Sequence, residues 1–145
     1  MTVATAVVVK RTFAAPREKV FEAWVNPALM AQWFARCKYS PLVEVLECDA
    51  RAGGNYRLVV TDDKGKVYHG RGVYREVRRP ERLVFTWHWD HDDYAESLVS
   101  VDFRALGESG FTEVTLTHEM LPDRAREDHR KGWEECYDML EIALR

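Results

Sequence analysis

The C-terminal stretch of the chain carries the pattern of an amphipathic helix. One stripe, with positions three or four residues apart, holds His129, Trp133, Cys136, Tyr137, Leu140 and Leu144. Charged residues fill most of the positions between them and would face water. The pattern predicts a helix over Asp123–Arg145, roughly 30 Å long, with Asp123 as the N-cap after Pro122. A stripe of this length needs a sheet to cover it.

The middle of the chain predicts six β-strands separated by turn signals. They are Leu42–Ala50, Asn55–Thr61, Val67–Val77, Arg82–Trp89, Glu96–Leu106 and Phe111–Met120. In the last three, apolar and polar residues alternate, which is typical of an antiparallel sheet with one covered face. In the third, Arg71 and Arg75 prefer water, so Gly70 and Gly72 would turn inward. Two glycines on that face would let the strand bend sharply.

The N-terminal part adds one strand and two short helices. Thr5–Phe13 is rich in β-branched residues and predicts a strand, and Pro16 then opens a helix. The pair Asn26-Pro27 restarts the chain into a second helix, Ala28–Phe34. Helices this short are stable only when packed against other elements. The order therefore predicts an α+β fold, in which a seven-stranded antiparallel sheet curves around the long C-terminal helix.

Composition narrows the class of protein. The 145 residues, without a linker or a repeat, predict one domain over 1–145. A net charge of −3 without a basic block argues against a nucleic-acid partner. The apolar run Val3–Val9 is too short to cross a bilayer, so no membrane partner is expected. Cys37, Cys48 and Cys136 form no CxxC pair, which argues against a disulfide framework or structural zinc and favours a reducing, cytoplasmic setting.

Several short motifs are spread along nearly the whole chain, in the order in which a known family carries them. They are Arg11–Pro16, Val20-Phe21, Ala23-Trp24, Trp33-Phe34, Gly53–Arg57, Gly72–Val77, Pro80–Trp87, Val114–Glu119 and His129–Trp133. With them the chain resembles the START/polyketide-cyclase/pollen-allergen superfamily (SRPBCC). Within it, the chain resembles the branch named for the C-terminal domain of the activator of heat-shock-protein-90 ATPase. The resemblance implies a helix-grip fold and no shared catalytic motif. Superfamily members bind lipids, hormones or polyketides, and some catalyse reactions, so the fold alone does not define the function.

The inward-facing residues predict a ligand cavity between sheet and helix. We expect it to be lined by Tyr56, Phe85, Trp87, Trp89, Val101, Phe103, Leu116, His118, His129, Gly132, Trp133 and Tyr137. The alternative is that these side chains fill a solid core, with His118 hydrogen-bonded to backbone. Gly132 costs about 1 kcal/mol inside a helix. It is either a tolerated surface glycine or a place where a strand or ligand passes too close for a Cβ.

The residues that could carry chemistry do not form a known catalytic or metal motif. Burial should lower the pKa of His118 below its reference of about 6.5. Glu119 next to it should point to the opposite face, so the two cannot pair for acid–base chemistry. The acidic run His88–Asp93 has no metal-ligand spacing. We therefore predict no catalytic residue, no metal and no cofactor.

Three functions are compatible with these predictions. The first is a binder of a small apolar, lipid-like or aromatic ligand, which needs an empty cavity. The second is a polyketide-cyclase- or hydrolase-like enzyme with His118 or a cavity tyrosine as proton-transfer group, which needs a close polar pair as well. The third is a protein-interaction module similar to the chaperone activator, which needs no cavity. The identity of the ligand, a protein partner, and a monomeric or homodimeric state are left open.

Overall fold

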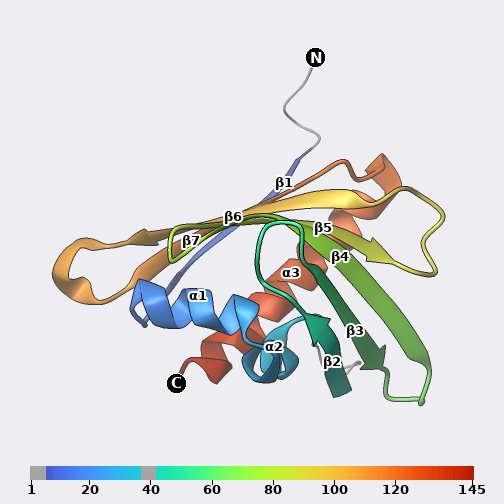
Figure 1. Ribbon diagram of the computed structural model, residues 1–145, viewed down its shortest axis with the longest axis horizontal. Coiled ribbons are helices and arrows are strands. Elements are labelled where there is room, and N and C mark those ends of the chain that lie inside the picture. The colour runs from blue at the N-terminus through green and yellow to red at the C-terminus, as the bar shows by residue number, and fades with distance from the viewer. Residues whose placement is uncertain (1–5, 37–41) are drawn as a thin grey trace.

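A computed structural model describes residues 6–36 and 42–145; Thr5 and Cys37 lie outside these ranges. Within them the chain forms seven strands and three α-helices (Figure 1). The elements are β1 (Val7–Phe13), α1 (Arg17–Val25), α2 (Pro27–Trp33), β2 (Leu42–Cys48), β3 (Asn55–Thr61), β4 (Val67–Arg78), β5 (Arg82–Trp89), β6 (Ser97–Ala105), β7 (Thr112–Glu119) and α3 (Asp123–Ala143). The predicted fold class is confirmed.

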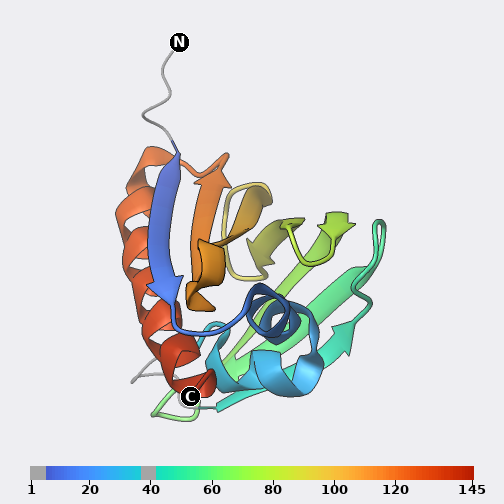
Figure 2. The same ribbon diagram turned by 90° about the vertical axis from the view of Figure 1, so that its left-hand side faces the viewer.

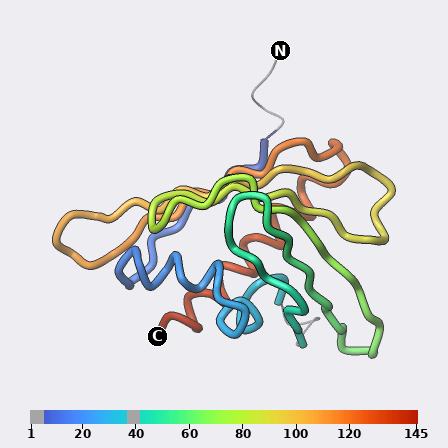
Figure 3. The backbone as a smooth tube through the Cα atoms, in the orientation of Figure 1, coloured from blue at the N-terminus to red at the C-terminus, as the bar shows by residue number. Residues whose placement is uncertain are grey.

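The strands form one antiparallel sheet in the order β1-β7-β6-β5-β4-β3-β2. All neighbours except β1 and β7 are consecutive in sequence, as expected for strands joined by tight turns. The two short helices α1 and α2 lie between β1 at one edge and β2 at the other. The sheet curves, and the helices lie along its concave side (Figures 1 and 3).

Helix α3 runs along the concave side beside β1 and β7 (Figure 2). Its predicted stripe is confirmed, because Trp133, Cys136, Tyr137 and Leu140 are buried. The predicted N-cap is wrong. Pro122 occupies the N-cap position without a side-chain hydrogen bond, and Asp123 belongs to the first helical turn. The carboxylate of Asp123 accepts from Arg126 Nη1 at 2.7 Å rather than from the free backbone N–H groups.

The short helices are held to each other by hydrogen bonds. Asn26 caps α2, because its Oδ1 accepts from the backbone N–H of Ala28 at 3.0 Å. Trp33 Nε1 donates to the carbonyl oxygen of Ala23 in α1 at 2.8 Å. Helix α2 therefore begins at Pro27 and ends at Trp33, one residue earlier at each end than predicted.

The two β4 glycines face inward as predicted, and they leave room for aromatic side chains. The hydroxyl of Tyr56 passes beside Gly72 and donates to the carbonyl oxygen of Thr86 at 2.5 Å. A Cβ on Gly72 would overlap both Thr86 and Tyr56, whereas one on Gly70 would meet Trp87. The alternation within Arg82–Trp89 predicts that Thr86 faces water, but the residue is buried. Its Oγ1 accepts from the backbone N–H of Val73, close to the register shift between β4 and β5.

Candidate functional site

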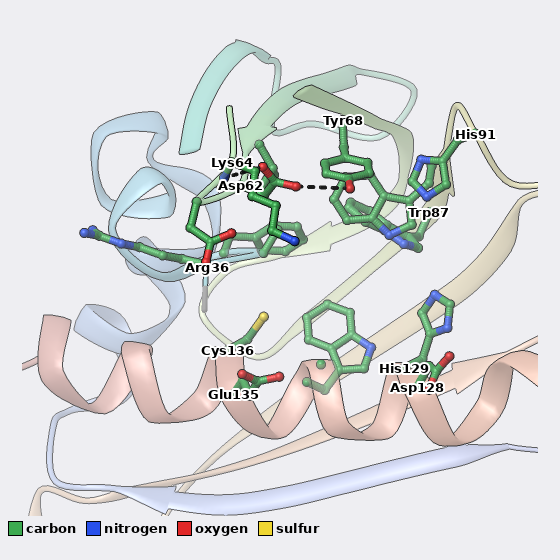
Figure 4. A pocket seen from close by; sticks show the side chains of 17 residues that line it. Arg36, Asp62, Lys64, Tyr68, Trp87, His91, Asp128, His129, Glu135 and Cys136 are labelled. Atoms are coloured by element: carbon green, nitrogen blue, oxygen red, sulfur yellow. Dashed lines mark hydrogen bonds between the residues drawn. The ribbon is translucent and has the colours of Figure 1, made fainter. Parts of the chain in front are cut away.

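A cavity of about 620 Å³ opens between the concave side of the sheet and α3. Figure 4 shows the labelled side chains of α3 on one side and those of the sheet and the β3–β4 turn on the other. Its described lining consists of Phe34, Ala35, Arg36, Val60, Asp62, Asp63, Lys64, Tyr68, Trp87, Trp89, His91, Asp128, His129, Gly132, Trp133, Glu135 and Cys136.

Aromatic side chains make up much of the apolar wall. Trp87 and Trp89 of β5 lie edge to face, with ring centroids 4.9 Å apart. Phe34, just after α2, contacts Trp87 at 5.6 Å and Trp133 of α3 at 5.7 Å, again edge to face. Phe34 thus bridges the two aromatic walls. Edge-to-face pairs of this kind add roughly 0.5–1.5 kcal/mol each beyond area burial, so the walls support each other.

The polar part of the lining contains residues of both charges and two histidines. Within it, the carboxylate of Asp62 in the β3–β4 turn accepts three hydrogen bonds. They come from the backbone N–H groups of Lys66 and Lys64 and from the hydroxyl of Tyr68 at 3.3 Å. These bonds, that from Lys66 first, lower the pKa of Asp62, so it is ionised near neutral pH. On α3, His129 Nδ1 lies 2.9 Å from the carbonyl oxygen of Ala125, and its buried Nε2 has no hydrogen-bond partner within the described residues.

The structure divides the twelve predicted cavity residues into two groups. Those on the cavity wall are Trp87, Trp89, His129, Gly132 and Trp133. The remaining seven predicted residues do not line the cavity and pack in the core: Tyr56, Phe85, Val101, Phe103, Leu116, His118 and Tyr137. The helices cover most of the concave face with their own side chains, and the space lies near β3, β4, β5, the residues after α2 and the middle turns of α3. Sequence reasoning missed Phe34, Tyr68 and the charged rim. The sequence Asp62-Asp63-Lys64-Gly65 is a typical hairpin turn, and nothing in it indicates that three of its residues line a cavity.

His118 is fully buried behind the cavity wall. Its Nδ1 accepts from Trp133 Nε1 at 3.0 Å, and its Nε2 lies 2.6 Å from Ser97 Oγ. Both ring nitrogens therefore contact side chains, whereas the solid-core alternative gave His118 a backbone partner. Burial, and secondarily the neighbouring His129, lowers the pKa of His118 to about 3. The predicted direction of this shift is confirmed.

The pKa of His118 should make stability depend on pH. In the unfolded chain the imidazole takes up a proton near pH 6.5, whereas in the folded protein it does so only near pH 3. The contribution of His118 to the free energy of unfolding is present in full above the pKa of the unfolded chain. It is lost as pH falls through this window, at up to about 1.4 kcal/mol per pH unit. Urea unfolding at several pH values between these limits, in the wild type and in His118→Asn, isolates this slope. Parallel stability profiles for the two proteins would contradict it.

Gly132 faces the cavity rather than a neighbouring strand. An added Cβ would have no heavy atom of the described neighbours within 4 Å. The hypothesis that another strand passes too close is therefore wrong. Gly132 widens the cavity at the middle of α3, where any larger side chain would point into the space.

The described residues contain neither a cluster suited to a metal ion nor a membrane-spanning helix. No group of three or more His, Cys, Asp or Glu in residues 6–36 and 42–145 is arranged to hold a metal ion. None of the helices in these ranges combines the length and hydropathy needed to cross a membrane.

The curved sheet, the long helix and the cavity define an α+β domain of the helix-grip type. The family model described as "Activator of Hsp90 ATPase homolog 1-like protein" matches residues 14–145. The chain belongs to this family, and through it to the START-like superfamily. No curated protein matches the chain.

Solved structures share the fold at low sequence identity. A Chromobacterium violaceum protein is 24% identical, with 98% of each chain covered and a TM-score of 0.87. CalU16 from Micromonospora echinospora is 21% identical over 96% of this chain and 75% of its own, with a TM-score of 0.73. DynU16, described as a protein in the dynemicin biosynthetic locus, is 22% identical over 97% of this chain and 47% of its own, with a TM-score of 0.76. At these identities the similarity establishes the fold.

Proposed function

We propose that this protein binds a small, largely apolar or aromatic ligand in the cavity between the sheet and α3. The observation that carries the proposal is the cavity itself. Its volume of about 620 Å³ and its Trp87, Trp89 and Trp133 lining suit a small organic molecule. Sites for such ligands typically measure about 300–1,000 Å³ and combine aromatic walls with a few polar groups. The location of DynU16 in a biosynthetic locus also supports a small-molecule role for this fold.

Enzymatic catalysis in the same cavity is less well supported. Of the proton-transfer groups expected from the sequence, His118 does not reach the ligand, because both of its ring nitrogens contact Ser97 and Trp133. The tyrosine on the cavity wall, Tyr68, donates to Asp62, whose lowered pKa makes it a weak base. A binding role requires neither group to change its protonation state. An interaction module of the chaperone-activator type would not require the cavity to be empty.

Filling the cavity at Gly132 should abolish ligand binding without damaging the fold. A leucine at this position would project into open space and should also raise helix stability by up to about 1 kcal/mol. The probe is N-phenyl-1-naphthylamine, a neutral aromatic dye whose fluorescence rises in apolar surroundings. We expect saturable binding by the wild type, and a loss of binding by Gly132→Leu together with unchanged or increased thermal stability.

The matched control is Lys131→Leu, which adds the same side chain one residue away on the exposed face of α3. It should bind the dye as the wild type does. Two results would contradict the proposed function. One is dye binding that survives in Gly132→Leu. The other is a wild type that binds neither the dye nor any member of a panel of lipids and aromatic compounds.

A further inference from the structure

A chain of hydrogen bonds connects the two tryptophan walls of the cavity from behind. Trp133 Nε1 donates to His118 Nδ1 at 3.0 Å, and His118 Nε2 lies 2.6 Å from Ser97 Oγ. Ser97 Oγ in turn donates to the carbonyl oxygen of Trp87 at 3.2 Å. The chain thus runs from α3 through β7 and β6 to β5, and both of its ends are residues of the cavity wall.

The two ends of this chain determine its direction. An indole N–H can only donate, so His118 Nδ1 must present its lone pair to Trp133. A carbonyl oxygen can only accept, so the hydroxyl proton of Ser97 points to Trp87. Ser97 then accepts from His118, whose single proton must be on Nε2. Only the neutral imidazole with this tautomer satisfies every group, and the ring is buried with no exposed surface.

We propose that His118 and Ser97 are positioning residues of the ligand cavity, which hold Trp133 at a set orientation opposite Trp87. This inference rests on the proposed function. The other ring contacts of Trp133 are a stacked contact with Trp24 at 6.2 Å and an edge contact with Phe34 at 5.7 Å. Such apolar contacts permit the indole to slide or tilt, whereas a hydrogen bond depends steeply on direction. The His118 ring also packs edge to face against His129, with ring centroids 5.1 Å apart.

Two conservative substitutions of His118 separate positioning from simple core packing. In His118→Asn the side-chain oxygen can take the place of Nδ1 and still accept from Trp133. In His118→Gln the amide instead reaches the place of Nε2 and Ser97, leaving the indole N–H without its acceptor. Both replacements are polar and uncharged, so a general loss of packing would not favour the asparagine, which is the smaller of the two.

The experiment measures N-phenyl-1-naphthylamine affinity together with hydrogen exchange of the Trp133 indole N–H by NMR. Loss of one directional hydrogen bond should weaken dye binding about tenfold in His118→Gln and less than about threefold in His118→Asn. Exchange of the indole N–H should be fast only in His118→Gln. The control is His69→Gln, which removes an exposed imidazole on β4 and should change neither value.

A second pair of variants keeps the inference testable if His118→Gln folds poorly. Trp133→Phe keeps an aromatic ring but removes the donor, and should weaken dye binding about as much as His118→Gln. Adding His118→Leu, which removes the acceptor with a side chain of similar size, should then cause no further loss, because the bond is already absent.

Equal indole exchange in the asparagine and glutamine variants, or fully additive losses in the double variant, would overturn the positioning role. A wild type that binds no dye would instead count against the proposed function, and the exchange rates would still decide whether His118 holds Trp133.

Discussion

Truncation of Trp133 to alanine is expected to lower the free energy of unfolding by about 3–5 kcal/mol. The side chain is 6% exposed, stacks on Trp24 and contacts Phe34, so its removal leaves a large space in the core beside α2. It also leaves the lone pair of His118 Nδ1 buried without its donor, which adds to the cost. Urea unfolding of the wild type and variant measures the difference.

The control for this prediction is Lys131→Ala, two residues earlier on the exposed face of α3. A surface substitution of this kind should change stability by less than about 0.5 kcal/mol. If Trp133→Ala costs less than about 1 kcal/mol, α3 does not have the central place in the core that its contacts indicate.

The fold could be predicted because the patterns that define it are local and long. The stripe along α3 and the alternation in β5, β6 and β7 each assign a buried face, and a one-residue shift would expose that face to water. Turn sequences such as Asp62–Gly65 set where the strands end. The errors occur where a single side chain chooses between partners. Asp123 pairs with Arg126 instead of capping the helix. Thr86 is buried although it is polar, because its hydroxyl accepts a hydrogen bond from the backbone of Val73.

The cavity was harder to predict because alternation shows which side of a strand faces inward but not what lies opposite. Phe103 and Leu116 face the same side of the sheet as Trp87, yet they pack in the core and only Trp87 reaches the space. The difference depends on how α1, α2 and α3 are placed across the sheet, and this is a property of tertiary packing. Phe34 could have been included, since it follows Trp33 at the end of a helix that must pack on the sheet.

The partners of His118 show the same limit at the level of one residue. Its burial and the direction of its pKa shift follow from its place on the covered face of β7. Its hydrogen-bond partners, Ser97 and Trp133, come from a neighbouring strand and from α3. Sequence spacing carries no information about which of many inward polar groups will meet across such elements.

Substitution of Gly72 in β4 by alanine is expected to cause the second large loss of stability, because the added Cβ has no room. This Cβ would overlap the backbone carbonyl of Thr86 and the hydroxyl of Tyr56, and a backbone atom in a sheet cannot move aside cheaply. The substitution should also break the buried hydrogen bond from Tyr56 to Thr86. Together, overpacking and an unsatisfied carbonyl should cost about 3 kcal/mol or more.

Alanine at three glycines should therefore rank by what each Cβ meets. Gly72→Ala meets backbone and should destabilise most. Gly70→Ala meets the Trp87 ring, which can shift, and should cost about 1–2 kcal/mol. Gly132→Ala meets open space on a helix and should stabilise by up to about 1 kcal/mol. Denaturant unfolding of the three variants under one condition tests the order. Equal losses of stability at Gly70 and Gly72 would mean that β4 can bend away from Thr86. They would also mean that Tyr56 does not hold β4 and β5 at their present separation.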